Sequence, residues 1–288
     1  MACSPPAAEC VLTEKPQHSE RNSHKLKDMN IVVCIKQVPD TNEVKLDPVK
    51  GTLIRDGVPS IINPDDKAGL EAALRIKDEL GARVSVVTMG PLQADIALRE
   101  ALAMGADEAY LITDRAFAGA DTWATSSTLA AVMKKLPYDL IITGRQAIDG
   151  DTAQVGPQIA EHLGLVNISY AEEIKVEGDS VMVKRQYEDR YHILKAKMPC
   201  LITALSELNK PRYMTPGGIF DAFREKEVTV WTLKDLEVDM ANIGLKGSPT
   251  RVVKSFTKPL KGEGQVVELD PEESVSFLME KLSEKFII

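Results

Sequence analysis

Short apolar runs alternate with longer segments of helical period from Met29 to about residue 165. The apolar runs are rich in β-branched residues and lack polar alternation, which is typical of strands buried on both faces of a parallel sheet. Such strands belong to a sheet that helices cover on both sides. We expect four of them, at NIVVCIKQV (30–38), ARVSVVTMG (82–90), EAYLIT (108–113) and YDLIITG (138–144).

The segments between these runs carry the start and stop signals of helices. In NPDDKAGLEAALRIKDELG, Asn63 is placed to cap the helix, Pro64 takes its first position and Gly81 ends it. Three more helices are expected, at residues 91–106, at residues 121–136 with Asp121 as cap, and at residues 153–164. This alternation predicts an α/β fold with a doubly wound, mostly parallel sheet.

The pattern changes after residue 165. Residues 171–205 alternate with period two around an EGDS turn, which predicts antiparallel strands added to an edge of the sheet. Residues 209–227, NKPRYMTPGGIFDAFREKE, follow neither period and predict an irregular surface segment. Beyond Trp231 a polar arm precedes a last helix at about 271–286. We therefore divide the chain into an α/β domain (29–231) and a C-terminal arm (232–288).

The first 28 residues differ from everything that follows. They are polar, have no apolar period and lack the apolar centre of a secretory signal. Met29 then directly precedes the first expected strand, as a natural start would. We interpret residues 1–28 as a disordered leader or a cloning extension.

Composition narrows the functional classes. An apolar fraction of 44% supports a substantial core, and a net charge of −8 argues against nucleic acid or an anionic membrane as the main partner. No apolar stretch approaches the roughly 18 residues of a membrane span. The four cysteines are scattered without CxxC spacing, which predicts neither a disulfide framework nor a zinc site and favours the cytoplasm.

The common catalytic motifs are missing from the sequence. The first strand is not followed by GxGxxG, and no P-loop, GxSxG or HExxH motif occurs. The four histidines form no pair at metal-ligand spacing. Ordinary dinucleotide-binding, hydrolase and metalloenzyme functions are therefore disfavoured, and we expect no catalytic residue and no metal.

A binding site is instead expected beyond the carboxyl ends of the strands, where open parallel sheets bind their ligands. Three segments arrive there, CIKQVPD (34–40), TMGP (88–91) and GRQAIDGDTAQVG (144–156). Their glycines, Gly90, Gly144 and Gly150, let a ligand approach the backbone closely. Spacing alone leaves open that the third segment is an ordinary turn.

The third segment carries two carboxylates, yet its position suits an anion. Backbone amides at residues 151–154 start a helix and are expected to hold a phosphate. Either Asp151 or Thr152 is expected to cap that helix. Asp149 is expected to accept a hydrogen bond from a ribose hydroxyl or from a basic side chain. Cys34 and Met89 are expected to pack in the core rather than to react.

Several of these stretches together resemble the beta subunit of electron-transfer flavoproteins, over nearly the whole chain from Met29. The residues that carry the resemblance are VCIKQVPD (33–40), INPDD (62–66), VTMGP (87–91), ALREALAMGAD (97–107), GRQAIDGDTAQVGPQ (144–158) and LNKPRYM (208–214). The resemblance implies a heterodimer with an alpha subunit, whose mobile domain carries FAD and on which the arm at 232–288 packs.

The resemblance also implies an adenine nucleotide at the expected site. Its contacts carry over to Cys34, Lys36, Asn63, Asp66, Thr88, Met89, Gly90, Gly144, Arg145, Gln146, Ala147, Ile148, Asp149, Gly150, Asp151, Thr152, Ala153, Gln154 and Val155. Residues 204–226 are similar to the family's recognition loop for a partner dehydrogenase, and their composition is that of interface anchors. The expected anchors are Arg212, Tyr213, Met214, Pro216, Ile219 and Phe220.

Two branches of the family differ in that nucleotide. In one it is a structural AMP, and in the electron-bifurcating branch it is a second FAD that takes hydride from NADH. AIDGDTAQVGPQ (147–158) looks like the bifurcating branch. The resemblance then implies ferredoxin or flavodoxin as low-potential acceptor, and a flavin dehydrogenase reached through the alpha-subunit FAD.

Pro216 stands where members that dock acyl-CoA dehydrogenases commonly have Leu. The acceptor can therefore be an enoyl-CoA reductase of the acyl-CoA dehydrogenase type or an FAD-dependent lactate dehydrogenase. A third hypothesis, besides the two branches of the family, is an ATP-binding regulatory module of similar fold. It is disfavoured because the sequence has no SGGxDS-like loop.

Overall fold

One sheet of nine strands organises the part of the chain that this computed structural model describes, residues 29–40, 59–253 and 264–288. In spatial order the strands are β11 (Val228–Trp231), β5 (Glu108–Ile112), β4 (Arg83–Met89), β1 (Asn30–Cys34), β6 (Leu140–Gly144), β10 (Cys200–Ala204), β7 (Val166–Glu177), β8 (Ser180–Gln186) and β9 (Tyr191–Lys197). The predicted leader at 1–28 lies outside the described residues.

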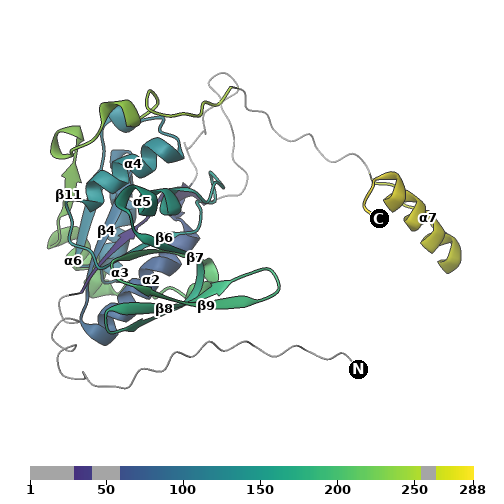
Figure 1. The fold of residues 1–288 in the computed structure, drawn as a ribbon, viewed down its shortest axis with the longest axis horizontal. Coiled ribbons are helices and arrows are strands. Elements are labelled where there is room, and N and C mark those ends of the chain that lie inside the picture. The colour runs from purple at the N-terminus through teal and green to yellow at the C-terminus, as the bar shows by residue number, and fades with distance from the viewer. Residues whose placement is uncertain (1–28, 41–58, 254–263) are drawn as a thin grey trace.

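The sheet is parallel from β11 to β7, and only β8 and β9 pair antiparallel at one edge. A separate antiparallel pair joins β2 (Gln37–Pro39) to β3 (Ser60–Ile62). The predicted α/β class, with a mostly parallel sheet and antiparallel edge strands, is confirmed (Figure 1).

Helices cover both faces of the sheet. These are α2 (Pro64–Leu80), α3 (Asp95–Met104), α4 (Thr122–Met133) and α5 (Val155–Leu163), while α6 (Pro216–Arg224) packs against α3 and α7 (Pro271–Glu284) lies outside these layers (Figure 1). Alternate residues of β1 show the two layers: Ile31 and Val33 pack with the apolar sides of α2 and α3, whereas Val32 and Cys34 pack with α4 and α5. Such a strand has no polar face, which is why its sequence is uniformly apolar.

Two helix boundaries confirm the sequence signals and one refines them. Gly81 ends α2 in the left-handed conformation, and the Asp121 side chain accepts a hydrogen bond from the Ala124 amide at the start of α4. Asn63 takes the capping position of α2 but makes no capping hydrogen bond. Its side chain is used elsewhere, in the site described below.

The prediction for residues 171–205 was wrong at its end. Cys200–Ala204 does not join the antiparallel edge, because β10 inserts parallel between β6 and β7, and all five of its residues are buried. CLITA lacks polar alternation, and a strand without a polar face is stable only when both of its faces are covered. The uniformly apolar run CLITA therefore indicated a strand buried on both faces, although it follows directly after the alternating residues.

The irregular segment expected at 209–227 contains a short helix. Thr215 caps α6 and Pro216 takes its first position. Gly218 allows α6 to lie against α3, since a Cβ there would overlap the Ala103 carbonyl oxygen. After α6 the chain forms β11, which pairs parallel with β5. Gly217 and Gly218 break the apolar period that would have revealed the helix.

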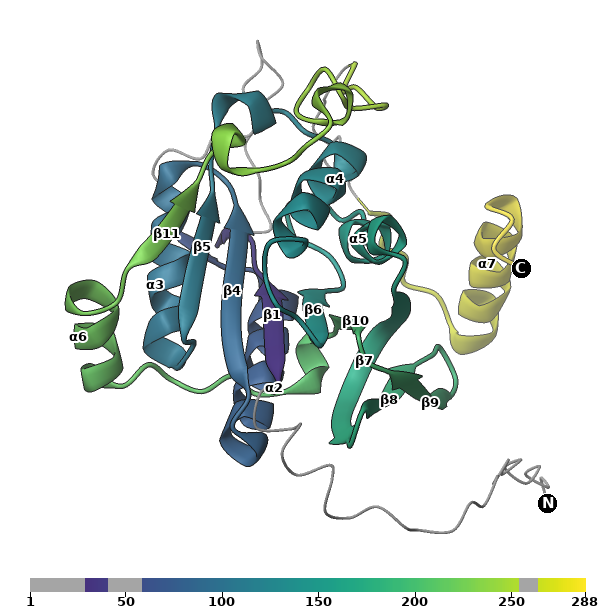
Figure 2. The same cartoon turned by 60° about the vertical axis from the view of Figure 1, so that its left-hand side comes forward.

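Helix α7 confirms the expected last helix and stands apart from the sheet in both views (Figures 1 and 2). Val275, Leu278 and Met279 on this helix are exposed. Within the described residues, no helix combines the length and apolar character required to cross a membrane.

Candidate functional site

The order of the strands reverses at β1. From β1 the chain moves outward to β4 and β5 on one side, and then returns to β6 on the other side. Such a switch point leaves a crevice beyond the carboxyl ends of the strands, where open α/β sheets bind ligands. The segments that follow β1, β4 and β6 meet at this edge, as expected from the sequence (Figure 2).

Asn63 ties the loop after β6 to the rest of this edge. Its side-chain nitrogen donates to the Gln146 carbonyl at 2.8 Å, and its side-chain oxygen accepts from the Ile148 amide at 3.0 Å. Its own amide donates to the Lys36 carbonyl at 2.9 Å. Because one buried amide group matches two backbone groups of the loop, Asn63 fixes the loop instead of capping α2.

Asp66 joins the ends of two strands. Its carboxylate accepts from the Lys36 amide at 2.8 Å and from the Gly144 amide at 2.9 Å. Burial raises the pKa of Asp66 to about 7, although these two amides and Asn63 act in the opposite direction. Gly144 has no space for a side chain, since a Cβ there would overlap Asp66 and Asp65. This glycine therefore serves the contact with α2, whereas the sequence had suggested an approach for a ligand.

The negative charge of the loop is compensated inside the protein. Lys36 Nζ lies 2.6 Å from Asp149 Oδ1, and the Asp149 side chain is only 3% exposed. Of the two partners expected for Asp149, the structure shows the basic one. An acidic residue can thus lie at this edge without repelling an anion, because Lys36 neutralises it.

The start of α5 differs from the expectation. Val155 is its first residue and Gln154 takes the capping position, so the prediction of Asp151 or Thr152 as cap was wrong. Asp151 and Ala153 both have positive φ, and the Asp151 amide donates to the Ala147 carbonyl. The Asp151 carboxylate accepts from the Gln146 side chain. The tight turn at 147–151 is followed by a helix that begins two residues later than expected, at Val155.

Free amides nevertheless remain at the start of this helix. Within the described residues, the backbone amides of residues 152–156 donate no hydrogen bond to the protein. Orphan amides at a helix start attract an anion through their own partial charges and the helix dipole. The amides expected to hold a phosphate are therefore in place, except that of Asp151, which is used inside the loop.

The remaining expected contacts lie at the ends of β1 and β4. Cys34 is buried, and burial raises the pKa of its thiol to about 12, followed by the effect of Asp66. It therefore stays a neutral thiol, in agreement with its expected packing role. Thr88 is buried, Met89 and Gly90 are half-buried, and the Gly90 amide donates to the Ile112 carbonyl. Gly150 alone of the loop glycines faces open space.

Asp65 is a participant that sequence reasoning placed in the helix but did not single out. Its carboxylate accepts from the Ser206 amide at 3.0 Å and lies 3.4 Å from Arg145 Nε without forming a hydrogen bond there. Burial raises the pKa of Asp65, and Arg145 opposes this. The adjacent acids in NPDD gave no signal of this burial, because acidic residues are favoured at the start of exposed helices as well.

The segment expected to contact a protein partner is strongly exposed. Tyr213 is 88% exposed, and Met214, Ile219 and Phe220 also face solvent, as does Pro216. Arg212 differs from these residues because its side chain is paired within the chain. Its guanidinium forms hydrogen bonds with Glu71 and Asp78 of α2, so it serves as an internal contact.

Apolar side chains of α3 and α6 that were not anticipated are also exposed. Phe223 follows Phe220 on α6, and the Arg99 guanidinium lies 5.3 Å from the Phe223 ring centre. Leu92 and Ile96, before and at the start of α3, are 70% and 61% exposed. Their helical spacing was visible in the sequence, but the face on which they lie became clear only with the fold.

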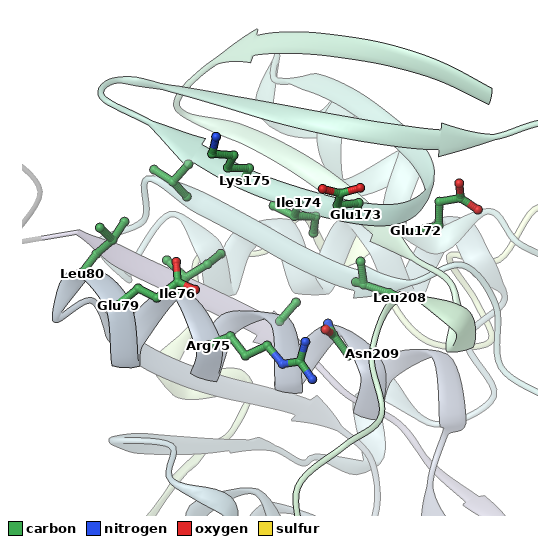
Figure 3. Close-up of a pocket in the computed structure, with 12 residues that line it drawn as sticks. Arg75, Ile76, Glu79, Leu80, Glu172, Glu173, Ile174, Lys175, Leu208 and Asn209 are labelled. Carbon is green, nitrogen blue, oxygen red and sulfur yellow. The ribbon is translucent and has the colours of Figure 1, made fainter.

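A cavity of about 370 Å³ lies elsewhere, between α2 and β7 (Figure 3). Leu208 and Asn209 close one end of it, and charged side chains of both signs surround an apolar floor. None of its lining residues belongs to the loop at 144–156. Among the described residues, no group of three or more His, Cys, Asp or Glu side chains is arranged to hold a metal ion.

Comparison with known proteins identifies the family. The electron transfer flavoprotein domain matches residues 50–236. The chain is 60% identical over 260 residues to the electron transfer flavoprotein subunit beta of Clostridium acetobutylicum, covering 90% of this chain and 100% of that one. The chain belongs to the electron transfer flavoprotein family, and several of its relatives are named as beta subunits.

Other relatives of this electron transfer flavoprotein carry names of larger complexes. Subunit CarD of a caffeyl-CoA reductase–Etf complex from Acetobacterium woodii is 56% identical over 263 residues, and an acryloyl-CoA reductase electron transfer subunit gamma from Anaerotignum propionicum is 48% identical over 268 residues. Both matches cover 90% of this chain and 100% of the relative. The resemblance seen in the sequence is thereby confirmed.

Proposed function

We propose that this beta subunit holds an adenine-bearing cofactor at the switch point of its sheet and serves in electron bifurcation. The observation that carries the proposal is the loop at 144–156, held over its first residues by Asn63 and by Asp66 at the start of α2, and ending in unpartnered amides. Such an edge suits a ligand that has both an anionic group and a group that packs against a sheet end. FAD and AMP both meet this description.

The residues present fit such a cofactor. The amides of residues 152–156 would hold its phosphate, and Lys36 keeps the neighbouring Asp149 from repelling it. The ends of β1 and β4, with Cys34, Thr88 and Met89, would line the part of the site next to the sheet. FAD, when bound, supplies the hydride and single-electron chemistry, while these side chains bind it and exclude water.

We favour FAD with NADH as donor over structural AMP. The names of two close relatives place them in reductase complexes, which supports a flavin at this site. In this proposal one electron goes to ferredoxin or flavodoxin in the cytoplasm. The other goes, through the FAD of the alpha subunit, to a flavin dehydrogenase, which is either an enoyl-CoA reductase or a lactate dehydrogenase.

Two surfaces would assemble this complex. The arm at 232–288, with the exposed apolar residues of α7, would pack on the alpha subunit. The segment at 204–226 would dock the dehydrogenase through Tyr213, Met214 and Phe220. Large exposed apolar side chains that gather on one surface are typical of protein interfaces.

The count of cofactors in the purified heterodimer tests the proposal. Two FAD per heterodimer, with bleaching on addition of NADH and reduction of ferredoxin only when a dehydrogenase acceptor is present, is the expected result. One FAD and one AMP would establish the conventional transfer function instead. Lys36→Met and Asp149→Asn provide the test of the site: Lys36→Met removes the positive charge that faces Asp149 and should lower cofactor occupancy, whereas Asp149→Asn removes the negative charge and should not.

A further inference from the structure

Residues 206–212 follow one side of α2 and are bonded to it at successive turns. The Ser206 amide donates to Asp65, the Asn209 side chain donates to the Ala68 carbonyl at 3.4 Å, and Arg212 reaches Glu71. Asp65, Ala68 and Glu71 are three residues apart and therefore lie on the same side of the helix. Figure 3 shows Asn209 beside α2 at one end of the cavity.

The contact between Arg212 and Glu71 is the strongest of these. Arg212 Nε lies 2.9 Å from Glu71 Oε2 and Nη2 lies 3.3 Å from Oε1, while the Arg212 amide donates to Oε2 at 3.0 Å. Glu71 is buried, with 3% of its surface exposed. A buried carboxylate needs a fixed positive partner, and two-pronged pairing by a guanidinium fixes direction as well as charge.

The exposed residues of the proposed docking surface follow directly after this contact. Tyr213 and Met214 are the next two residues, and α6 presents Ile219, Phe220 and Phe223. The far side of α6 is also fixed, because Arg99 Nη1 donates to the Ala222 carbonyl at 2.5 Å. The apolar surface is thus held between a polar contact with α2 and a packed contact with α3.

We propose that Arg212 is a positioning residue for dehydrogenase docking. Its ion pair with buried Glu71 fixes the place from which Tyr213, Met214 and α6 face the partner, and its side chain does not itself contact the partner. This inference rests on the proposed function of the 204–226 segment. We therefore expect substitution of Arg212 to weaken binding of the dehydrogenase strongly and to leave cofactor binding unchanged.

The test compares two arginines that share Glu71. Arg75 also bonds to Glu71, at 3.0 Å, but its side chain is more exposed, and among the described residues it forms no hydrogen bond or ion pair with the 206–212 segment. Arg212→Gln and Arg75→Gln are prepared as flavin-loaded heterodimers, and binding to the enoyl-CoA reductase purified from the same cells is measured. Arg212→Gln should raise the Kd about tenfold, and Arg75→Gln less than about twofold.

Kinetics separate positioning from general damage. Arg212→Gln should raise the KM for the reductase in proportion to its Kd, while kcat at saturating reductase and flavin content stay those of the unaltered protein. Arg212→Lys keeps a positive charge next to Glu71, so the chain folds, but a lysine ammonium cannot form the bidentate contact that the guanidinium makes. It should give a Kd between those of Arg212→Gln and the unaltered protein.

The outcomes are distinct. An Arg212→Gln Kd equal to that of Arg75→Gln overturns the positioning role, as does a loss of flavin that parallels the loss of docking. Phe220→Ala probes the docking surface itself. If Phe220→Ala weakens docking and both Arg212 variants do not, only the positioning role fails. If Phe220→Ala leaves the Kd unchanged, the docking surface and the positioning role both fail.

Discussion

The loop at 144–156 and the outer surface of α6 and α7 use their side chains in opposite ways. At the loop, polar groups are paired within the chain, with Asn63, Asp66 and Lys36 each bonded to a defined atom. On α6 and α7, apolar side chains such as Phe220 and Leu278 face outward. The first part of the loop is fixed by contacts within the single chain, whereas the outer surface has the composition of a surface that a protein partner covers.

The difference indicates when each region acquires its functional shape. A loop whose backbone is already bonded loses little freedom when it binds a ligand, so its binding energy is not spent on ordering. Exposed apolar residues gain their stability only when a partner removes them from water. Substitutions at the loop should therefore act on the isolated chain, and substitutions on α7 should act only on the assembly.

Gly144→Ala should have the largest effect on the isolated chain. A Cβ at this position would overlap the Asp66 carboxylate and approach Asp65, both of which belong to the rigid start of α2. We expect a loss of about 3 kcal/mol in the free energy of unfolding, measured by urea denaturation. Gly150→Ala is the matched control, because its Cβ would meet no atom within 4 Å and its φ is not positive.

Equal destabilisation by Gly144→Ala and Gly150→Ala would show that the loop is not fixed by α2. If Gly144→Ala instead lowered the cofactor content and left the free energy of unfolding unchanged, Gly144 would be needed for the approach of the ligand, as the sequence had suggested, and not for the contact with Asp66.

The pH dependence of stability should come next in size. The pKa of Asp66 is about 7 in the folded chain, above the value of about 3.9 for an unfolded aspartate. Its contribution is therefore full below about pH 4 and decreases as the pH rises toward 7. The decrease should amount to about 2 kcal/mol between pH 5 and 7. Unfolding of the isolated chain by urea at several pH values measures it.

Asp66→Asn isolates this effect because the side chain no longer titrates. The pKa of Glu71 is lowered, because hydrogen bonds from Arg212 outweigh the effect of burial. This group makes the chain less stable as the pH falls, and it does so equally in the unaltered protein and in Asp66→Asn. The difference between the two pH profiles therefore belongs to Asp66. Identical profiles would contradict the raised pKa.

The sequence predicted the parts of this molecule that local pattern determines. The buried strands, Gly81 and Asp121 as helix ends, and the edge of the sheet at which the loop lies all followed from period and capping. The roles of Asn63 and Arg212 did not follow. Both have partners far away in the sequence, at Ile148 and Glu71, and local propensity contains no information about such pairs.

Asn63→Ala should have a smaller effect than the changes at Gly144 and Asp66. It removes the bonds to the Gln146 carbonyl and the Ile148 amide, both of which can then reach water in part. We expect a loss of about 1.5 kcal/mol in the free energy of unfolding. Asn63→Asp keeps an acceptor for the Ile148 amide but replaces the donor to the Gln146 carbonyl with a buried carboxylate beside Asp66, so it should lose more. Faster amide exchange at Ile148 in Asn63→Ala than in the unaltered protein would support the assignment of the bond to that amide.

Leu278→Ser should have almost no effect on the isolated chain, and this is what sharpens the contrast between the two regions. Leu278 is 58% exposed on α7, next to Val275 and Met279 on the same side of the helix. Removing it changes the stability of the isolated chain by less than about 0.5 kcal/mol, but it should weaken association with the alpha subunit more than tenfold. Glu280→Ser, on the other side of α7, is the control and should leave both quantities unchanged.

If Leu278→Ser destabilised the isolated chain and left the association intact, α7 would be packing on its own chain in solution, and its exposed side would not be a partner surface. Equal association for both variants would place the alpha subunit on another part of the chain.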